Sequence, residues 1–276
     1  MIWTKDGIVP DDALAVSVRD RTFEHGLGLF ETLRTWNGRP SLLPRHLDRL
    51  VRSARALGLA IEDVSLPSPA DVAALLAADA RQGDAMLRIT LTGGTSAAGG
   101  ATLWMRSAPL PTSSHKNGVR LGTTGPARSD PLAAHKTLNY WPYRLLAEKA
   151  AAEACDEALL LDPKGRVLEG TRTNVFFVVR GALVTPPADG RILPGVMRGL
   201  VIERARDLGI PVNEKTLAPA ARPDEVFLTN AVRGALPVAR WGEAEFPAPG
   251  MVTERLWTDA RRWLEADDSA PFESSA

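Results

Sequence analysis

The chain has 276 residues, and its 33 basic and 33 acidic side chains give a formal net charge of zero, so nothing favours binding to nucleic acid or to an anionic membrane. It lacks both a run of about 18 apolar residues that could span a bilayer and an apolar signal segment at its N-terminus, so we expect a cytoplasmic protein. A single cysteine, Cys155, excludes a disulfide framework and a cysteine-ligated metal cluster.

The N-terminal part alternates strand and helix patterns. Its first clear strand alternates apolar and polar residues and ends at Asn37-Gly38, a strong hairpin signal. An amphipathic helix follows, with its apolar residues on one face and Gly58 at its end. Strands are predicted at 30–36, 86–92 and 103–106, and helices at 45–57 and 70–80.

A segment rich in proline and serine, Pro109 to Gly118, has no apolar period and predicts a domain boundary. Beyond it, strands are predicted at 158–161, 175–179, 182–185 and 225–229, and helices at 142–155 and 196–208. We therefore predict an α/β or α+β protein of two mixed domains. The predicted parts are an N-terminal domain at 1–112, a linker at 113–120, a C-terminal domain at 121–266 and a disordered tail at 267–276.

Lys136 lies in a semi-apolar segment, His-Lys-Thr-Leu-Asn-Tyr-Trp, where burial would favour the neutral amine that a Schiff-base lysine needs. Glu169 lies in a polar loop that runs into an apolar strand. A reactive lysine and a buried carboxylate that holds a pyridinium proton are the two groups that pyridoxal phosphate chemistry needs most. A lysine is more often a solvated surface charge, and the local pattern alone leaves both interpretations open.

An anion such as a cofactor phosphate could bind where Pro194 and Gly195 precede the predicted helix from Val196. Backbone N–H groups at a helix N-terminus and the helix dipole favour a negative charge. The same residues would also fit an ordinary turn that leads into a helix and binds no anion. The polar side of the helix at 45–57 carries several arginines, including Arg49, which could bind the anion or lie in solvent.

Six segments resemble, in the same order, the class IV pyridoxal phosphate aminotransferases, which are the fold-type IV enzymes. The resemblance extends from Arg19 to about Arg240, and it implies a small N-terminal α/β domain and a larger, mixed, β-barrel-like C-terminal domain. Any one segment is a weak signal, but six in order identify the chain as a member. The segments are Arg19–Thr32, Arg45–Leu50, Lys136–Tyr140, Glu169–Phe176, Leu193–Arg198 and Glu225–Asn230.

The resemblance implies a role for each matching residue. Lys136 would be the Schiff-base lysine and the acid/base, and Glu169 would keep the pyridine nitrogen of the cofactor protonated. Arg49 would bind the phosphate, and Tyr140 would hydrogen-bond the ring hydroxyl, although it lies one residue closer to the lysine than in the branched-chain enzymes. The other implied cofactor contacts are Gly195, Val196, Met197, Asn230 and Ala231, and the implied substrate contacts are Phe30, Met86 and Arg88.

The family contains branched-chain aminotransferases, D-amino acid aminotransferases and 4-amino-4-deoxychorismate lyase, and three segments favour the lyase. Thr229-Asn230-Ala231-Val232 resembles the lyase pattern, because aminotransferases usually carry at Ala231 a hydroxyl residue that reaches the phosphate. Lys136-Thr137-Leu138-Asn139 resembles the lyase and the D-amino acid enzymes. Thr92-Gly93-Gly94 has glycine where the D-amino acid enzymes place an arginine.

Arg88 instead favours a branched-chain aminotransferase, because it matches the carboxylate-binding arginine of those enzymes. We therefore expect a lyase that releases pyruvate and 4-aminobenzoate, the folate precursor, from a carboxylate-bearing amine. The alternatives are a transaminase for D-amino acids, branched-chain amino acids or amines, and a family member without catalysis. The retention of Lys136, Glu169 and Arg49 opposes the last.

Other classes of site fit the sequence less well. No Gly-X-Ser-X-Gly motif supports a serine hydrolase. The four histidines, His25, His46, His115 and His135, are too scattered to indicate a metal site, and we expect each to be packed or at the surface. The family resemblance implies a homodimer with small-molecule substrates.

Overall fold

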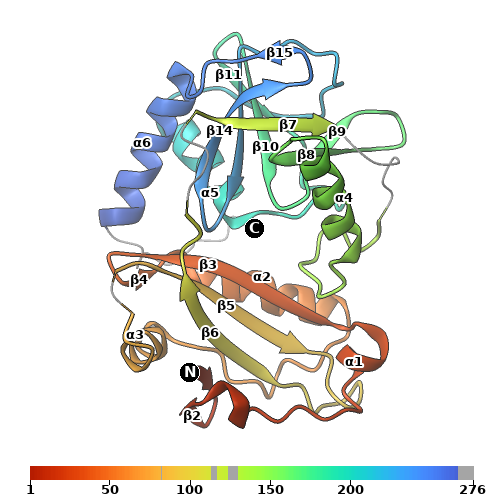
Figure 1. Cartoon of the computed structure of the whole chain (residues 1–276), viewed down its shortest axis with the longest axis vertical. Coiled ribbons are helices and arrows are strands. Elements are labelled where there is room, and N and C mark those ends of the chain that lie inside the picture. The colour runs from red at the N-terminus through yellow and green to blue at the C-terminus, as the bar shows by residue number, and fades with distance from the viewer. Residues whose placement is uncertain (82, 113–116, 124–129, 267–276) are drawn as a thin grey trace. The chain divides into compact units, whose positions relative to one another are not determined.

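The computed structural model describes residues 1–81, 83–112, 117–123 and 130–266. The chain forms two compact units (Figure 1). Unit 1 contains Met1–Pro111, His135–Asn139 and Leu264–Ala276, and unit 2 contains Thr112–Ala134 and Tyr140–Trp263.

Unit 1 is built on a six-stranded sheet with the order β2-β1-β6-β5-β3-β4, in which every pair is antiparallel. Two longer helices, α2 and α3, pack against the sheet (Figure 1). The elements are β1 (Ile2–Thr4), β2 (Gly7–Val9), α1 (Arg21–His25), β3 (Gly28–Trp36), β4 (Arg39–Pro40), α2 (Leu43–Ala56), α3 (Pro69–Ala78), β5 (Ala85–Thr92) and β6 (Leu103–Pro109).

Strand alternation separates the two faces of this sheet. One face is apolar and forms a single core with α2 and α3, in which Leu33, Leu87 and Ile89 of the strands are fully buried. The opposite face carries polar and charged side chains among its half-buried positions, including Thr32 and Arg88. The hydrophobic effect therefore fixes which strand residues lie away from the helices.

Unit 2 is built on a nine-stranded mixed sheet with the order β12-β11-β10-β13-β14-β7-β8-β9, in which β15 pairs with β14. The strands β9 and β10 also contact each other, so the sheet curls back on itself. The elements are β7 (Val119–Thr123), α4 (Trp141–Ala152), β8 (Glu157–Leu161), β9 (Val167–Gly170), β10 (Asn174–Val179), β11 (Ala182–Thr185), α5 (Val196–Asp207), β12 (Val212–Glu214), β13 (Glu225–Asn230), β14 (Gly234–Trp241), β15 (Ala244–Glu245) and α6 (Met251–Ala266).

Both faces of this curled sheet are apolar, which explains why its strands read as continuous hydrophobic runs. On β10, Phe177 joins an inner core with Val175 and Trp241. The neighbouring Phe176 points the other way and stacks on Phe227 in a core that includes α5 and α6. The mixed α/β fold with a barrel-like second part is confirmed.

The helices and strands predicted from periodicity are present, with ends that differ by a few residues. The predicted linker at 113–120 needs correction, because Val119 and Arg120 already belong to β7, while residues 113–116 lie outside the described part. The predicted C-terminal domain includes Lys136, but the segment of this residue groups with unit 1. The predicted tail at 267–276 also lies outside the described residues.

Candidate active site

The segment that carries Lys136 pairs with the first half of β3 in unit 1. The N–H of Phe30 donates to the carbonyl of Lys136 at 2.9 Å, and the N–H of Leu138 donates to the carbonyl of Gly28 at 3.0 Å. Gly28 has φ +152°, and a Cβ there would lie 2.6 Å from the side chain of Leu138. This close approach requires glycine, and it holds the lysine segment against the strand.

The Lys136 side chain is half-buried and lies over an aromatic ring. Its Nζ is 4.5 Å from the centroid of the Phe30 ring, and the guanidinium of Arg88 is 3.9 Å from the same centroid. Two cations on one ring are held by its quadrupole. The ring of Phe30 thus orients both the predicted Schiff-base lysine and a predicted substrate-binding arginine.

The three predicted substrate residues lie on one face of the unit 1 sheet. Phe30 is opposite Thr90, and Arg88 and Met86 are two residues apart on β5, with Arg88 opposite Thr32. Directly opposite residues and residues two apart share a face. Arg88 is also directly opposite Arg106 of β6, so two arginines lie side by side on this face.

On the other face of β3, Glu31 is fully buried against Arg49 and His46 of α2. Arg49 Nε donates to Glu31 Oε1 at 2.9 Å, and Arg49 Nη2 donates to Glu31 Oε2 at 2.6 Å. His46 Nδ1 lies 2.6 Å from Glu31 Oε2. This bidentate pair orients the guanidinium that is predicted to bind the phosphate.

The electrostatics of this cluster define its protonation. Burial alone would raise the pKa of Glu31, but the charge of Arg49 and the hydrogen bond from His46 lower that pKa to about 2. Burial lowers the pKa of His46 most, and the charges of Arg49 and Lys136 lower it further, against the effect of Glu31. His46 is therefore neutral, and its Nδ1 carries the proton because a carboxylate can only accept.

In unit 2, Glu169 lies on β9 and is 4% exposed. Its Oε2 accepts hydrogen bonds from the N–H of Leu193 at 3.0 Å and from Asn174 Nδ2 at 3.4 Å. The same Nδ2 donates to the carbonyl of Leu193 at 3.0 Å. These two donors fix the position of the carboxylate, and a carboxylate is the kind of group that can accept a pyridinium N–H.

Helix α5 begins next to this carboxylate. Gly195 is its N-cap, no side chain caps the helix, and the first helical bond runs from the N–H of Gly199 to the carbonyl of Gly195. The backbone N–H groups of Val196 and Met197 precede that bond, so the helix itself offers them no acceptor. A Cβ on Gly195 would collide with Asn174 Oδ1, so only glycine keeps this anion-binding end open.

The turn after β13 contains the predicted contacts Asn230 and Ala231. Asn230 Oδ1 accepts hydrogen bonds from the N–H groups of Val232 at 3.1 Å and Arg233 at 2.8 Å, which fixes the turn. The preceding Thr229 is 1% exposed, and its hydroxyl has no partner among the described residues. Thr229 is directly opposite Asn174 across β10 and β13, so the two side chains lie on the same face of the sheet.

Tyr140 is the N-cap of α4 and stacks on Tyr143 with ring centroids 5.1 Å apart. Its hydroxyl donates to the carbonyl of Thr171 at 3.3 Å. Within unit 2 the structure thus connects Tyr140 to the turn that follows Glu169. No spacing in the sequence indicated this contact.

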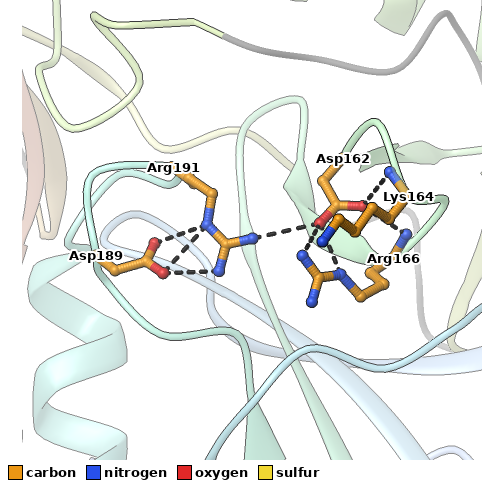
Figure 2. A network of polar contacts seen from close by, with 5 residues as sticks. All are labelled: Asp162, Lys164, Arg166, Asp189 and Arg191. Atoms are coloured by element: carbon orange, nitrogen blue, oxygen red, sulfur yellow. Dashed lines mark hydrogen bonds and ion pairs between the residues drawn. The ribbon is translucent and has the colours of Figure 1, made fainter.

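A charged network ties together the two loops that precede Glu169 and α5 (Figure 2). Asp162 accepts from Arg166 Nη2 at 2.6 Å and Arg191 Nη1 at 3.3 Å, and Arg191 also pairs with Asp189. Burial would raise the pKa of Asp162, but the bonds from Arg166 and from the N–H of Lys164 lower it overall. The network holds the β8–β9 turn against the loop that leads to Leu193.

The comparisons with known proteins show the family of the chain. Residues 28–241 match the model of the amino-transferase class IV family. The chain is 34% identical over 249 residues to a putative branched-chain-amino-acid aminotransferase of Methanocaldococcus jannaschii, with 86% of each chain covered. It is 27% identical over 265 residues to the aminodeoxychorismate lyase of Bacillus subtilis, with 89% of this chain and 88% of that protein covered.

Among solved structures, a T.th. branched-chain amino acid aminotransferase in complex with N-(5'-phosphopyridoxyl)-L-glutamate has a TM-score of 0.82 and 25% identity to this chain. The match covers 96% of this chain and 93% of that one. The family match and the fold therefore define a pyridoxal phosphate enzyme of fold-type IV. The chain belongs to the amino-transferase class IV family.

The residues present fit the cofactor by their chemistry. Taken by itself, unit 1 offers a primary amine over the Phe30 ring, and unit 2, taken by itself, offers the Glu169 carboxylate and a helix N-terminus whose Gly195 a larger residue would block. Among the described residues, no group of three or more His, Cys, Asp or Glu could hold a metal ion. The helices in the same part of the chain are each too short or too polar to cross a membrane.

Proposed function

We propose that this enzyme is a 4-amino-4-deoxychorismate lyase, which eliminates pyruvate from its substrate and releases 4-aminobenzoate. Lys136 is the reactive amine, and Glu169 holds the proton on the pyridine nitrogen of the cofactor. Arg49 and the N–H groups at Gly195, Val196 and Met197 bind the phosphate. Tyr140 contacts the ring hydroxyl, and Asn230 and Ala231 form the turn beside the phosphate.

The pair Arg88 and Arg106 carries this proposal. Like charges directly opposite each other destabilise a sheet, and a bound anion offsets that repulsion. Aminodeoxychorismate has two carboxylates, and arginine is the side chain best suited to hold them. The same face carries Thr32 and Thr90 beside Phe30 and Met86, so it offers polar and apolar contacts around the two arginines.

In the elimination, Lys136 acts as the base. Pyridoxal phosphate would supply an aldehyde for the substrate amine and a ring that stabilises the negative charge left when the C–H bond breaks. Lys136 Nζ removes the proton from the amine-bearing carbon. The C–O bond on the adjacent carbon then breaks, its oxygen leaves as enolpyruvate, and the ring becomes aromatic. Protonation of enolpyruvate on carbon gives pyruvate, so no oxidant is needed.

The direct test supplies aminodeoxychorismate to the cofactor-loaded enzyme and measures 4-aminobenzoate and pyruvate in equal amounts. In parallel, D-alanine, L-leucine and an amine donor are added singly while the absorbance of the lysine-bound cofactor is followed. Release of both products and an unchanged spectrum with every donor are expected. Conversion of the cofactor to pyridoxamine phosphate by a donor, without 4-aminobenzoate, contradicts the lyase.

A branched-chain-amino-acid aminotransferase is the second candidate, because the relative in Methanocaldococcus jannaschii carries that name and Arg88 could hold its substrate carboxylate. The Arg106→Gln variant distinguishes the lyase from the branched-chain-amino-acid aminotransferase. For a lyase we expect the KM for aminodeoxychorismate to rise about tenfold, since a charge-assisted hydrogen bond is lost. Arg52→Gln, on the exposed side of α2, is the control.

We further propose a cytoplasmic homodimer, as the family resemblance implies. Each unit exposes large apolar side chains that a partner could cover, among them Phe23 in unit 1 and Trp141 and Leu145 in unit 2. An exposed apolar surface of this kind is typical of association sites.

A further inference from the structure

The turn between β9 and β10 joins two residues of the candidate site. Glu169 precedes it and Asn174 follows it, and their side chains meet at 3.4 Å. The N–H of Gly170 donates to the carbonyl of Thr173 at 2.7 Å and closes the turn. Thr171 and Thr173 of this turn are buried, so their polar groups need hydrogen-bond partners.

Glu157, at the start of β8, supplies that acceptor and is 5% exposed. Its Oε1 accepts the N–H of Thr171 at 3.0 Å, the hydroxyl of Thr171, and the N–H of Ala158 at 3.0 Å. Its Oε2 accepts the N–H of Arg172 and the hydroxyl of Thr173, each at 3.3 Å. Four of these five donors belong to the turn.

The chemistry of the acceptor is specific. A carboxylate offers about four acceptor positions on two oxygens and no donor, whereas an amide would direct an N–H₂ group at these donors. Within the described residues Glu157 makes no ion pair, so its contacts with the turn are hydrogen bonds alone. The turn also closes tightly on it, because a Cβ on Gly170 would lie 3.2 Å from the Glu157 side chain.

Through Thr171, the hydrogen bonds of Glu157 also influence the position of Tyr140. Glu157 holds Thr171 through its N–H and its hydroxyl, and the carbonyl of the same residue accepts the hydroxyl of Tyr140 at 3.3 Å. One buried carboxylate therefore restrains both the backbone next to Glu169 and the acceptor of Tyr140. All four residues lie in unit 2.

We propose that Glu157 is a positioning residue, which holds the β9–β10 turn so that Glu169 stays aligned with the pyridine nitrogen and Tyr140 with the ring hydroxyl. The inference rests on the cofactor contacts under Proposed function. It applies equally to a lyase and to a transaminase, because both need a protonated pyridine ring. Glu157 is not one of the proposed cofactor or substrate contacts.

The chain offers a matched control in Glu225, a second buried carboxylate of unit 2. It accepts the N–H groups of Val252 and Thr253, both at 2.9 Å, and the Thr253 hydroxyl at 2.7 Å. These contacts hold the start of α6 and involve none of the proposed cofactor residues. Glu157→Gln and Glu225→Gln thus remove the same kind of contact at different places.

The test measures the ¹⁵N chemical shift of the pyridine nitrogen in enzyme loaded with ¹⁵N-labelled cofactor, together with kcat, KM and Tm. Both variants should lower Tm. Only Glu157→Gln should move the shift toward that of a deprotonated ring and lower kcat about tenfold at a similar KM. Equal Tm losses with an unchanged ¹⁵N shift and kcat in Glu157→Gln would overturn the proposal.

A second pair of variants, each of which removes a single hydroxyl group, tests the proposal if Glu157→Gln does not fold. Thr173→Val removes one hydroxyl from Glu157, and Thr253→Val removes one from Glu225. A smaller ¹⁵N shift in the same direction is expected for Thr173→Val alone, and no change in either variant rejects the inference.

Glu169→Gln distinguishes this failure from failure of the proposed function. If it leaves the ¹⁵N shift unchanged, the assigned role of Glu169 is wrong. If it moves the shift and the Glu157 variants do not, only the positioning role is wrong.

Discussion

Lys136 is the residue on which turnover depends. Its Nζ is the amine held over Phe30, in the segment that pairs with β3. We expect Lys136→Ala to lower kcat at least about 1,000-fold, because both covalent attachment and proton transfer are lost. Steady-state assay of product release measures this.

The control for Lys136→Ala is Lys149→Ala, on the exposed side of α4, which should keep full activity. Comparable activity in the two variants would remove Lys136 from the mechanism. The absorbance band of the lysine-bound cofactor gives an independent check, since it should vanish only in the first.

The buried cluster of Glu31, His46 and Arg49 makes stability depend on pH. The folded pKa values of Glu31 and His46 both lie below their unfolded values, so the unfolded chain binds more protons as the pH falls. Stability from His46 is present above its unfolded pKa of about 6.5 and is lost below it. Stability from Glu31 is lost between about pH 4.5 and 2, on the order of 3 kcal/mol.

Urea unfolding at pH 7, 6 and 5 checks the histidine part. The free energy of unfolding should fall over this range in the wild type and fall less in His46→Asn, whose amide can still donate to Glu31. Identical pH profiles for the two proteins would show that His46 does not contribute.

At the scale of elements, the N-terminus of α5 is shaped by one glycine. Gly195→Ala would place a Cβ against Asn174 Oδ1, which also disturbs the contact of Asn174 with Glu169. We expect the Kd for pyridoxal phosphate to rise about tenfold, a cost typical of one charge-assisted hydrogen bond. Titration of the apoenzyme with cofactor, followed by absorbance, measures the Kd.

Gly199→Ala is the matched control in the same helix. Its Cβ would meet only Glu203 Oε1 at 4.0 Å, so the substitution should stabilise α5 by about 0.5–1 kcal/mol and leave the Kd unchanged. If both variants bind the cofactor as the wild type does, the open end of α5 is not the phosphate site.

For the whole molecule, the proposed homodimer predicts a mass in solution. The chain has a mass of 29.7 kDa, so light scattering on the eluting protein should give about 59 kDa if two copies associate through exposed apolar surface. A mass near that of one chain at micromolar concentration would refute the dimer. The measurement does not depend on cofactor or substrate.

The sequence predicted the elements well where a signal was local and strong. The helix at α2 and the strands β3, β5 and β10 followed from periodicity, which depends only on neighbouring residues. Short elements, such as β1, β9 and β15, were missed because their runs of residues are too short to show a clear period. Helix α6 was missed although its apolar residues recur at helical spacing.

The sequence by itself determined the family, because six ordered segments carry Lys136, Arg49 and Glu169 with their neighbours. Only the tertiary structure decided which polar groups meet. Glu157 joins the turn after Glu169, and Arg106 lies opposite Arg88, because sheet register brings together residues that are far apart in the chain. The hydrophobic pattern of a sequence indicates that a side chain is buried. Which polar group it then contacts depends on how the strands pair, and the spacing of neighbouring residues in the sequence does not indicate that pairing.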